Sequence, residues 1–67
     1  MNLSARNQLK GTVKSVRLGQ VMAEVVITVG NNEVVAAITR QSAETLGLKA
    51  GDAVTAIIKA TEVIVAK

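Results

Sequence analysis

The chain has 67 residues, of which 49% are hydrophobic, and it contains no aromatic residue, no cysteine and no histidine. So short a chain has a small core, and this one cannot supplement it with a disulfide or with a Cys and His zinc site. The net charge of +3 is spread along the chain, which argues against a dedicated DNA-binding protein, and without aromatic rings bases cannot be recognised by stacking.

The apolar character of the chain suggests association with other subunits. Its mean hydropathy of +0.39 reflects more apolar surface than so few residues can easily hide within one subunit. No apolar run is long enough to span a bilayer, and the N-terminal residues lack the apolar stretch of a signal peptide. We therefore expect a soluble, cytoplasmic homo-oligomer that does not enter a membrane.

The first half of the chain predicts three strands. Residues 10–18 mix β-branched and charged residues in alternation, but the phase slips near Ser15, which indicates a strand with a bulge. Residues 21–38 alternate on both sides of Gly30-Asn31-Asn32, a segment whose residues tolerate positive φ. This pattern predicts a hairpin whose first strand is apolar on both faces.

The second half predicts a short helix and two further strands. Thr39 or Ser42 can cap a helix that ends at Leu46, with Gly47 as its left-handed C-terminal residue. A turn at residues 49–52 leads to a strand over residues 53–58, a polar break at 59–62 and a last strand over 63–66. The order indicates an all-β fold: a five-stranded OB-like barrel with one short helix between strands 3 and 4, formed by residues 1–67 as a single domain.

Two polar segments could carry chemistry. Ser4-Ala5-Arg6-Asn7 precedes the first strand and gathers mainly hydrogen-bond donors, and Lys59-Ala60-Thr61-Glu62 interrupts the last two strands. Taken alone, the first can be a surface arm whose arginine is held by a carboxylate, and the second can be an ordinary hairpin turn. Neither segment by itself establishes a binding site.

Together with the strand pattern, however, these segments resemble the molbindin (Mop) family along nearly the whole chain. The most specific part is the run S-A-R-N-x-L-x-G-x-V at residues 4–13, supported by A-E-V at 23–25, L-x-x-G-D at 48–52 and A-x-I-K-A-T at 56–61. The resemblance implies an OB-like fold, a hexamer built as a trimer of dimers, and molybdate or tungstate bound between subunits.

The resemblance also implies the residues that would hold the oxyanion. By motif position, Ser4, Arg6 and Lys59 are side-chain ligands, and the backbone N–H groups of Ala5 and Ala60 complete the site. Some relatives have serine at the position of Ala60, so here only the main-chain donor can remain. The bound species is the oxyanion itself, and neither a cofactor nor a separate metal site is expected.

The donor chemistry of these segments fits such a ligand. Molybdate at neutral pH is a dianion without a proton, so its pocket needs donors only, whereas hydrogenphosphate also needs an acceptor. Glu62 is adjacent to the second segment and would repel a dianion, so we expect its side chain to face away. Discrimination against sulfate would depend on pocket size.

Three other functions compete with molybdate storage and buffering. An enzyme is disfavoured, because Ser4 and Lys59 would be a nucleophile and base without a third orienting group. The alternative is an OB-fold nucleic-acid-binding protein, which the positive charge favours and the lack of aromatic residues disfavours. A purely structural module, with the polar segments only capping turns, is the third possibility.

Overall fold

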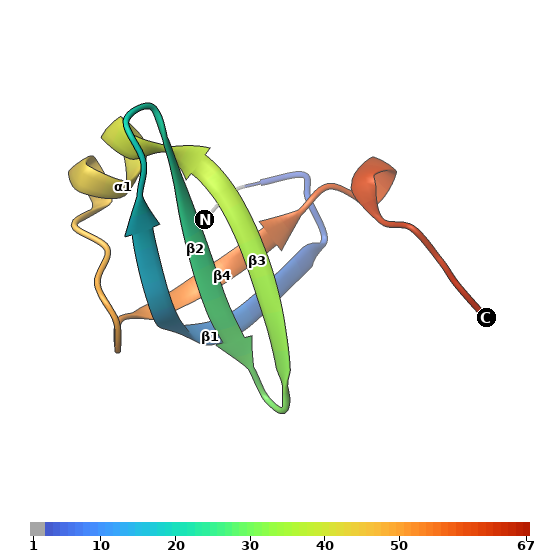
Figure 1. The fold of residues 1–67 in the computed structure, drawn as a ribbon. Helices are drawn as coiled ribbons and strands as arrows, with labels where there is room; N and C mark the ends of the chain where they lie inside the picture. The colour runs from blue at the N-terminus through green and yellow to red at the C-terminus, as the bar shows by residue number, and fades with distance from the viewer. Residues whose placement is uncertain (1–2) are drawn as a thin grey trace.

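A computed structural model of the chain, which describes residues 3–67, contains one four-stranded antiparallel sheet and a short helix (Figure 1). The elements are β1 (Asn7–Leu18), β2 (Met22–Val29), β3 (Asn32–Thr39), α1 (Arg40–Leu46), β4 (Ala53–Ile58) and the 3-10 helix η1 (Ala60–Glu62). The strand order is β3-β2-β1-β4. The mostly-β fold and the helix between the third and fourth strands are therefore confirmed.

Strand β1 is long and bent, and it joins the two halves of the sheet. Its first half pairs with β4 and its second half pairs with β2, with the change of partner at Thr12. The register to β2 shifts between Val13 and Ser15, which confirms the predicted bulge. β1 starts earlier than the predicted Lys10, because pairing with β4 extends the strand back to Asn7.

The bend requires glycine at position 11. A Cβ atom on Gly11 would lie 2.5 Å from the carbonyl oxygen of Thr28 and 2.8 Å from the side chain of Ile27. Real Cβ atoms do not approach backbone oxygen this closely. Gly11 therefore lets β1 pass directly over β2 at the point where β1 changes partners.

The hairpin and the helix end as their residues predict. Gly30 has φ 58° in the turn between β2 and β3, and Gly47 has φ 62° at the C-terminus of α1. The Thr39 hydroxyl accepts a hydrogen bond from the Ser42 N–H at 3.0 Å, so Thr39 is the helix N-cap. A side-chain cap thus begins this short helix, and a left-handed glycine ends it.

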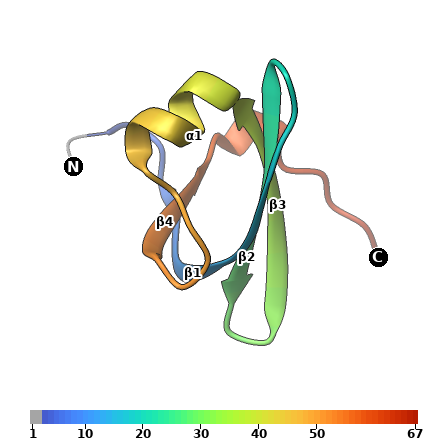
Figure 2. The same ribbon diagram turned by 60° about the vertical axis from the view of Figure 1, so that its left-hand side comes forward.

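The core lies on the concave side of the sheet. Val13, Val25, Ile27 and Ala56 form its buried cluster, and Val13 and Val25 are each 2% exposed. Figure 2 shows α1 across one end of the curved sheet, where Ala43 is its buried residue. Small β-branched side chains close the core here without any aromatic residue.

The predicted last strand over residues 63–66 is wrong. The chain leaves β4 through η1 and runs away from the sheet as an unpaired tail (Figure 1), so the described residues form four strands and the sheet does not close. Ile64 is 93% exposed and Val65 is 88% exposed. An apolar alternating sequence becomes a strand only where it pairs with a strand edge, and the tail runs away from the free edges of its own sheet (Figure 1).

The free edges of β3 and β4 border an apolar cavity of about 690 Å³. Consecutive residues of both strands line it, namely 34–38 of β3 and 54–58 of β4, and the buried core forms its floor. We call this cavity the open slot. It lies where a fifth strand would have to stand to close the sheet into a barrel.

Candidate oxyanion site

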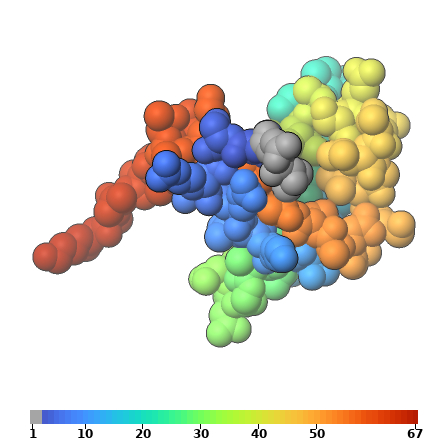
Figure 3. Space-filling model, turned by 180° about the vertical axis from the view of Figure 1, so that it is seen from behind, coloured from blue at the N-terminus to red at the C-terminus, as the bar shows by residue number. Residues whose placement is uncertain are grey.

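The pairing of β1 with β4 brings the two polar segments together. Asn7 is paired with Ile58, so the residues just before β1 and just after β4 lie at the same end of the sheet. Figure 3 shows the blue N-terminal segment packed beside the orange-red residues that follow β4. We call this region the motif end; it contains the predicted ligands Ser4, Ala5, Arg6, Lys59 and Ala60.

The donors of the motif end are accessible. Ser4, Arg6, Lys59 and Ala60 are exposed, and Ala5 is half-buried. Within residues 3–67 the ion pairs involve other cations, namely Lys14, Arg40 and Lys49. Arg6 is therefore not held by a carboxylate of the described chain, as the surface-arm interpretation required. Two cations without an internal partner at one end of a sheet form an anion-attracting surface.

The segment after β4 is a helical turn and not the hairpin turn that was its alternative interpretation. Lys59 is the N-terminal cap of η1, and its carbonyl oxygen accepts a hydrogen bond from the Glu62 N–H at 2.9 Å. The Val63 N–H donates to the Ala60 oxygen at 3.4 Å. These bonds do not use the N–H of Ala60, because the first N–H groups of a helical turn have no partner within it.

Glu62 was predicted to face away from the anion. It is exposed, and together with Lys59 it lines the open slot. Whether its carboxylate turns away when an anion is bound remains a prediction. Lys59 and Glu62 thus place one cation and one anion at the mouth of the same slot.

The sequence did not predict a role for Gln8 at the motif end. The Gln8 side chain donates a hydrogen bond from Nε2 to the carbonyl oxygen of Ala5 at 2.9 Å. The motif leaves this position open, so nothing in the sequence pattern pointed to it. A weak indication was present, because a long amide side chain next to a turn can donate a hydrogen bond to the backbone of that turn.

Comparison with known proteins identifies the family. The TOBE domain family model matches residues 3–65. Molybdenum-pterin-binding protein 3 of Clostridium pasteurianum is 48% identical over 66 residues, which cover 97% of each chain. This chain belongs to the molbindin (Mop) family of TOBE-domain proteins.

Solved structures agree with this assignment. A molybdate-binding protein from Sporomusa ovata has a TM-score of 0.95 and 49% sequence identity, with both chains covered to 100%. The cytoplasmic molybdate-binding protein ModG, with molybdate bound, has a TM-score of 0.86 and 46% identity; the match covers 90% of this chain and 43% of that one. The OB-like fold of this Mop-family chain therefore matches that of proteins described as molybdate-binding.

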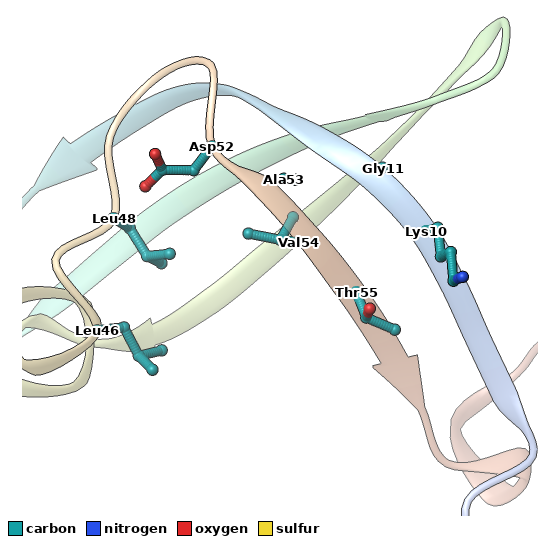
Figure 4. Close-up of a pocket in the computed structure, with 8 residues that line it drawn as sticks. All are labelled: Lys10, Gly11, Leu46, Leu48, Asp52, Ala53, Val54 and Thr55. Atoms are coloured by element: carbon teal, nitrogen blue, oxygen red, sulfur yellow. The ribbon is translucent and has the colours of Figure 1, made fainter. Parts of the chain in front are cut away.

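A second hollow in this Mop-family chain does not suit an oxyanion. It has a volume of about 630 Å³ and lies between β4 and the segment after α1, with Leu46, Leu48 and Val54 among its lining residues (Figure 4). Its carboxylate, Asp52, already accepts a hydrogen bond from the Lys49 N–H at 3.0 Å. Besides its apolar walls, the hollow is lined by this carboxylate, the Lys10 side chain and the Thr55 hydroxyl, so its donors lie beside a group that repels an anion.

The described residues contain neither a candidate membrane-spanning helix nor a cluster of metal-binding side chains. No helix within residues 3–67 combines the length and apolar character needed to cross a membrane. In the same part of the chain, no three His, Cys, Asp or Glu side chains lie close enough together to hold a metal ion. The motif end carries two cations, Arg6 and Lys59, that form no ion pair within the described residues.

Proposed function

We propose that this protein binds molybdate or tungstate at the motif end. In this proposal Ser4, Arg6 and Lys59 donate from their side chains, and Ala5 and Ala60 donate from their backbone N–H groups. The observation that carries the proposal is the β1 to β4 register, which brings both motif segments to one end of the sheet. The names of the relatives support molybdate as the ligand.

The chemistry of these groups favours a fully deprotonated tetrahedral dianion. Two cations offset its charge, and the hydroxyl and N–H groups supply donors to its remaining oxygens. None of the five residues carries a carboxylate that could accept a hydrogen bond from the hydroxyl group of hydrogenphosphate. Selection of molybdate or tungstate over the smaller sulfate then depends on the size of the assembled pocket.

We further propose that the site is completed in a homo-oligomer, which by resemblance is a hexamer built as a trimer of dimers. The exposed apolar tail and the open slot of one chain complement each other: the tail needs a strand edge, and the slot offers two. A neighbouring subunit's tail in this slot would supply the fifth strand of the barrel. Since Lys59 and Ala60 connect β4 to the tail, the anion would lie at the subunit interface.

A binding role without catalysis follows from this proposal. Residues 1–67 would act as one Mop domain that stores and buffers the oxyanion in the cytoplasm, as the description of ModG as cytoplasmic supports. The motif end offers donors but no general base oriented by a third group, so it can hold and release the anion. The ligand itself is the only species that such a site requires.

Calorimetric titration with molybdate, tungstate, sulfate and phosphate tests the proposal, on protein whose mass is measured by light scattering. We expect saturable binding of molybdate and tungstate alone, by a species of several subunits. A folded oligomer that binds none of the four anions contradicts the proposal. Single-stranded nucleic acid would then be titrated at low and high salt, since affinity that falls steeply with salt would support the alternative function.

A further inference from the structure

The arm that carries Ser4, Ala5 and Arg6 is tied to β1 by one side chain. The Gln8 amide donates to the Ala5 carbonyl at 2.9 Å and so closes a ring that contains Arg6 and Asn7. Among the described residues, this is the only side-chain hydrogen bond that reaches residues 3–6. The regular pairing with β4 begins only at Asn7.

The bond controls the direction of a backbone dipole beside the site. All described peptide bonds are trans, so the Ala5 carbonyl and the Arg6 N–H point in opposite directions. With the Ala5 oxygen held by Gln8, this oxygen cannot turn toward a dianion, which it would repel. The same ring fixes the backbone of Arg6 and hence the point from which its guanidinium extends.

We propose that Gln8 is a positioning residue of the oxyanion site, acting through Ala5 and Arg6 without touching the ligand. This inference rests on the proposed function, because it concerns affinity for the same anion. Gln8 itself is exposed and lies opposite Ile57 in the β1 to β4 ladder. The ladder holds β1 without its side chain, so loss of the amide donor affects the arm and leaves the fold intact.

Two substitutions separate the donor from the shape of the side chain. Gln8→Met keeps the length and removes the donor, and Gln8→Glu places an oxygen against the Ala5 oxygen. We expect molybdate affinity to fall about three- to tenfold in Gln8→Met, the equivalent of one hydrogen bond. The loss in Gln8→Glu should be larger, because its charge also repels the dianion.

Gln20 provides matched controls. It is exposed in the turn between β1 and β2, at the other end of β1 from Gln8. Gln20→Met and Gln20→Glu make the same chemical changes there, and both should leave affinity within about twofold of the parent, since exposed substitutions away from a site have small effects. Comparing the affinity loss of Gln8→Glu with that of Gln20→Glu then corrects for the general effect of one added negative charge.

If Gln8 only supported the fold, its replacement would lower the stability of the sheet together with the affinity for molybdate. A positioning role predicts a lower affinity with an unchanged sheet. In Gln8→Met the ligand-free melting temperature and the amide exchange of the sheet should be unchanged, while backbone NMR order parameters should fall only at residues 4–6. Equal affinity in the parent and both Gln8 variants overturns the inference, as does a loss of affinity that is matched by a general loss of stability. If the parent protein does not bind molybdate, the proposed function fails first, and the order parameters of residues 4–6 still test the tether.

Discussion

The two ends of β4 use their polar groups in different ways. At the end where β4 begins, the polar groups near α1 bond to one another. Thr39 caps the helix, Arg40 pairs with Glu44 at 3.1 Å, and Asp52 accepts a hydrogen bond from the Lys49 N–H. At the motif end, Arg6 and Lys59 have no carboxylate partner within residues 3–67. The polar groups around α1 therefore stabilise the fold, whereas Arg6 and Lys59 remain available for a ligand.

The apolar residues of the sheet core and of the tail show a similar contrast. Ile27 of β2 is 6% exposed, whereas Ile64 of the tail is 93% exposed, although both lie in alternating runs of small apolar residues. The sheet core thus folds on contacts within one chain, whereas the tail has no strand partner within residues 3–67, as expected if a second chain covers it. The predictions below test this difference, from the largest expected effect to the smallest.

The largest effect on the stability of the assembly should come from the tail. If a neighbouring slot buries it, Ile64→Ala should lower the free energy of unfolding of the oligomer by about 2 to 4 kcal/mol, as for a buried isoleucine. It should also shift the mass measured by light scattering toward smaller species at low concentration. Val21→Ala, at a residue that is 73% exposed in the β1 to β2 turn, serves as the control and should have little effect. An unchanged denaturation midpoint for Ile64→Ala would mean that the tail is free in the assembly.

Arginine substitution compares the two ends directly. Arg6→Ala should weaken molybdate binding by roughly 2 to 5 kcal/mol, because it removes one partner of a desolvated charge pair. Arg40→Ala should leave affinity unchanged, because Arg40 interacts with Glu44 and with the Gly19 carbonyl. Calorimetric titration of both variants checks this contrast, and equal losses would show that only net charge matters.

Hydroxyl substitution makes the same comparison on a smaller scale. Thr39→Ala should destabilise the protein by about 1 kcal/mol through loss of the helix cap and leave molybdate affinity intact. Ser4→Ala should do the reverse, with about 1 kcal/mol lost from binding and an unchanged melting temperature without ligand. Thermal denaturation and titration of each variant give both quantities. Ser4→Ala with parental affinity would remove Ser4 from the ligand set.

The fold could be predicted from sequence wherever its cause is local. Gly30 and Gly47 supply positive φ in the β2 to β3 turn and at the C-terminus of α1, and the slip of phase near Ser15 marks the bulge. The last strand could not be predicted correctly, because its alternating pattern does not say whether an edge is within reach. The tail has the sequence of a strand and lacks a partner in its own subunit.

The candidate site was predictable only in part. The motif segments named the ligands by resemblance, and the pairing of Asn7 with Ile58 then brought these segments to one end of the sheet. The Gln8 bond depends on the path of the backbone before β1, which no residue pattern encodes. The proposed pocket at a subunit interface would depend on contacts between chains, which the residue pattern of one chain does not encode.

The most direct test of this account is crystallographic. Crystals grown with tungstate and measured near the tungsten absorption edge should show anomalous density between two subunits, within hydrogen-bonding reach of Ser4, Arg6 and Lys59. The neighbouring tail should occupy the open slot in the same map. Tungsten bound elsewhere, or a motif end that remains empty in protein saturated with tungstate, would contradict the assignment of the oxyanion site.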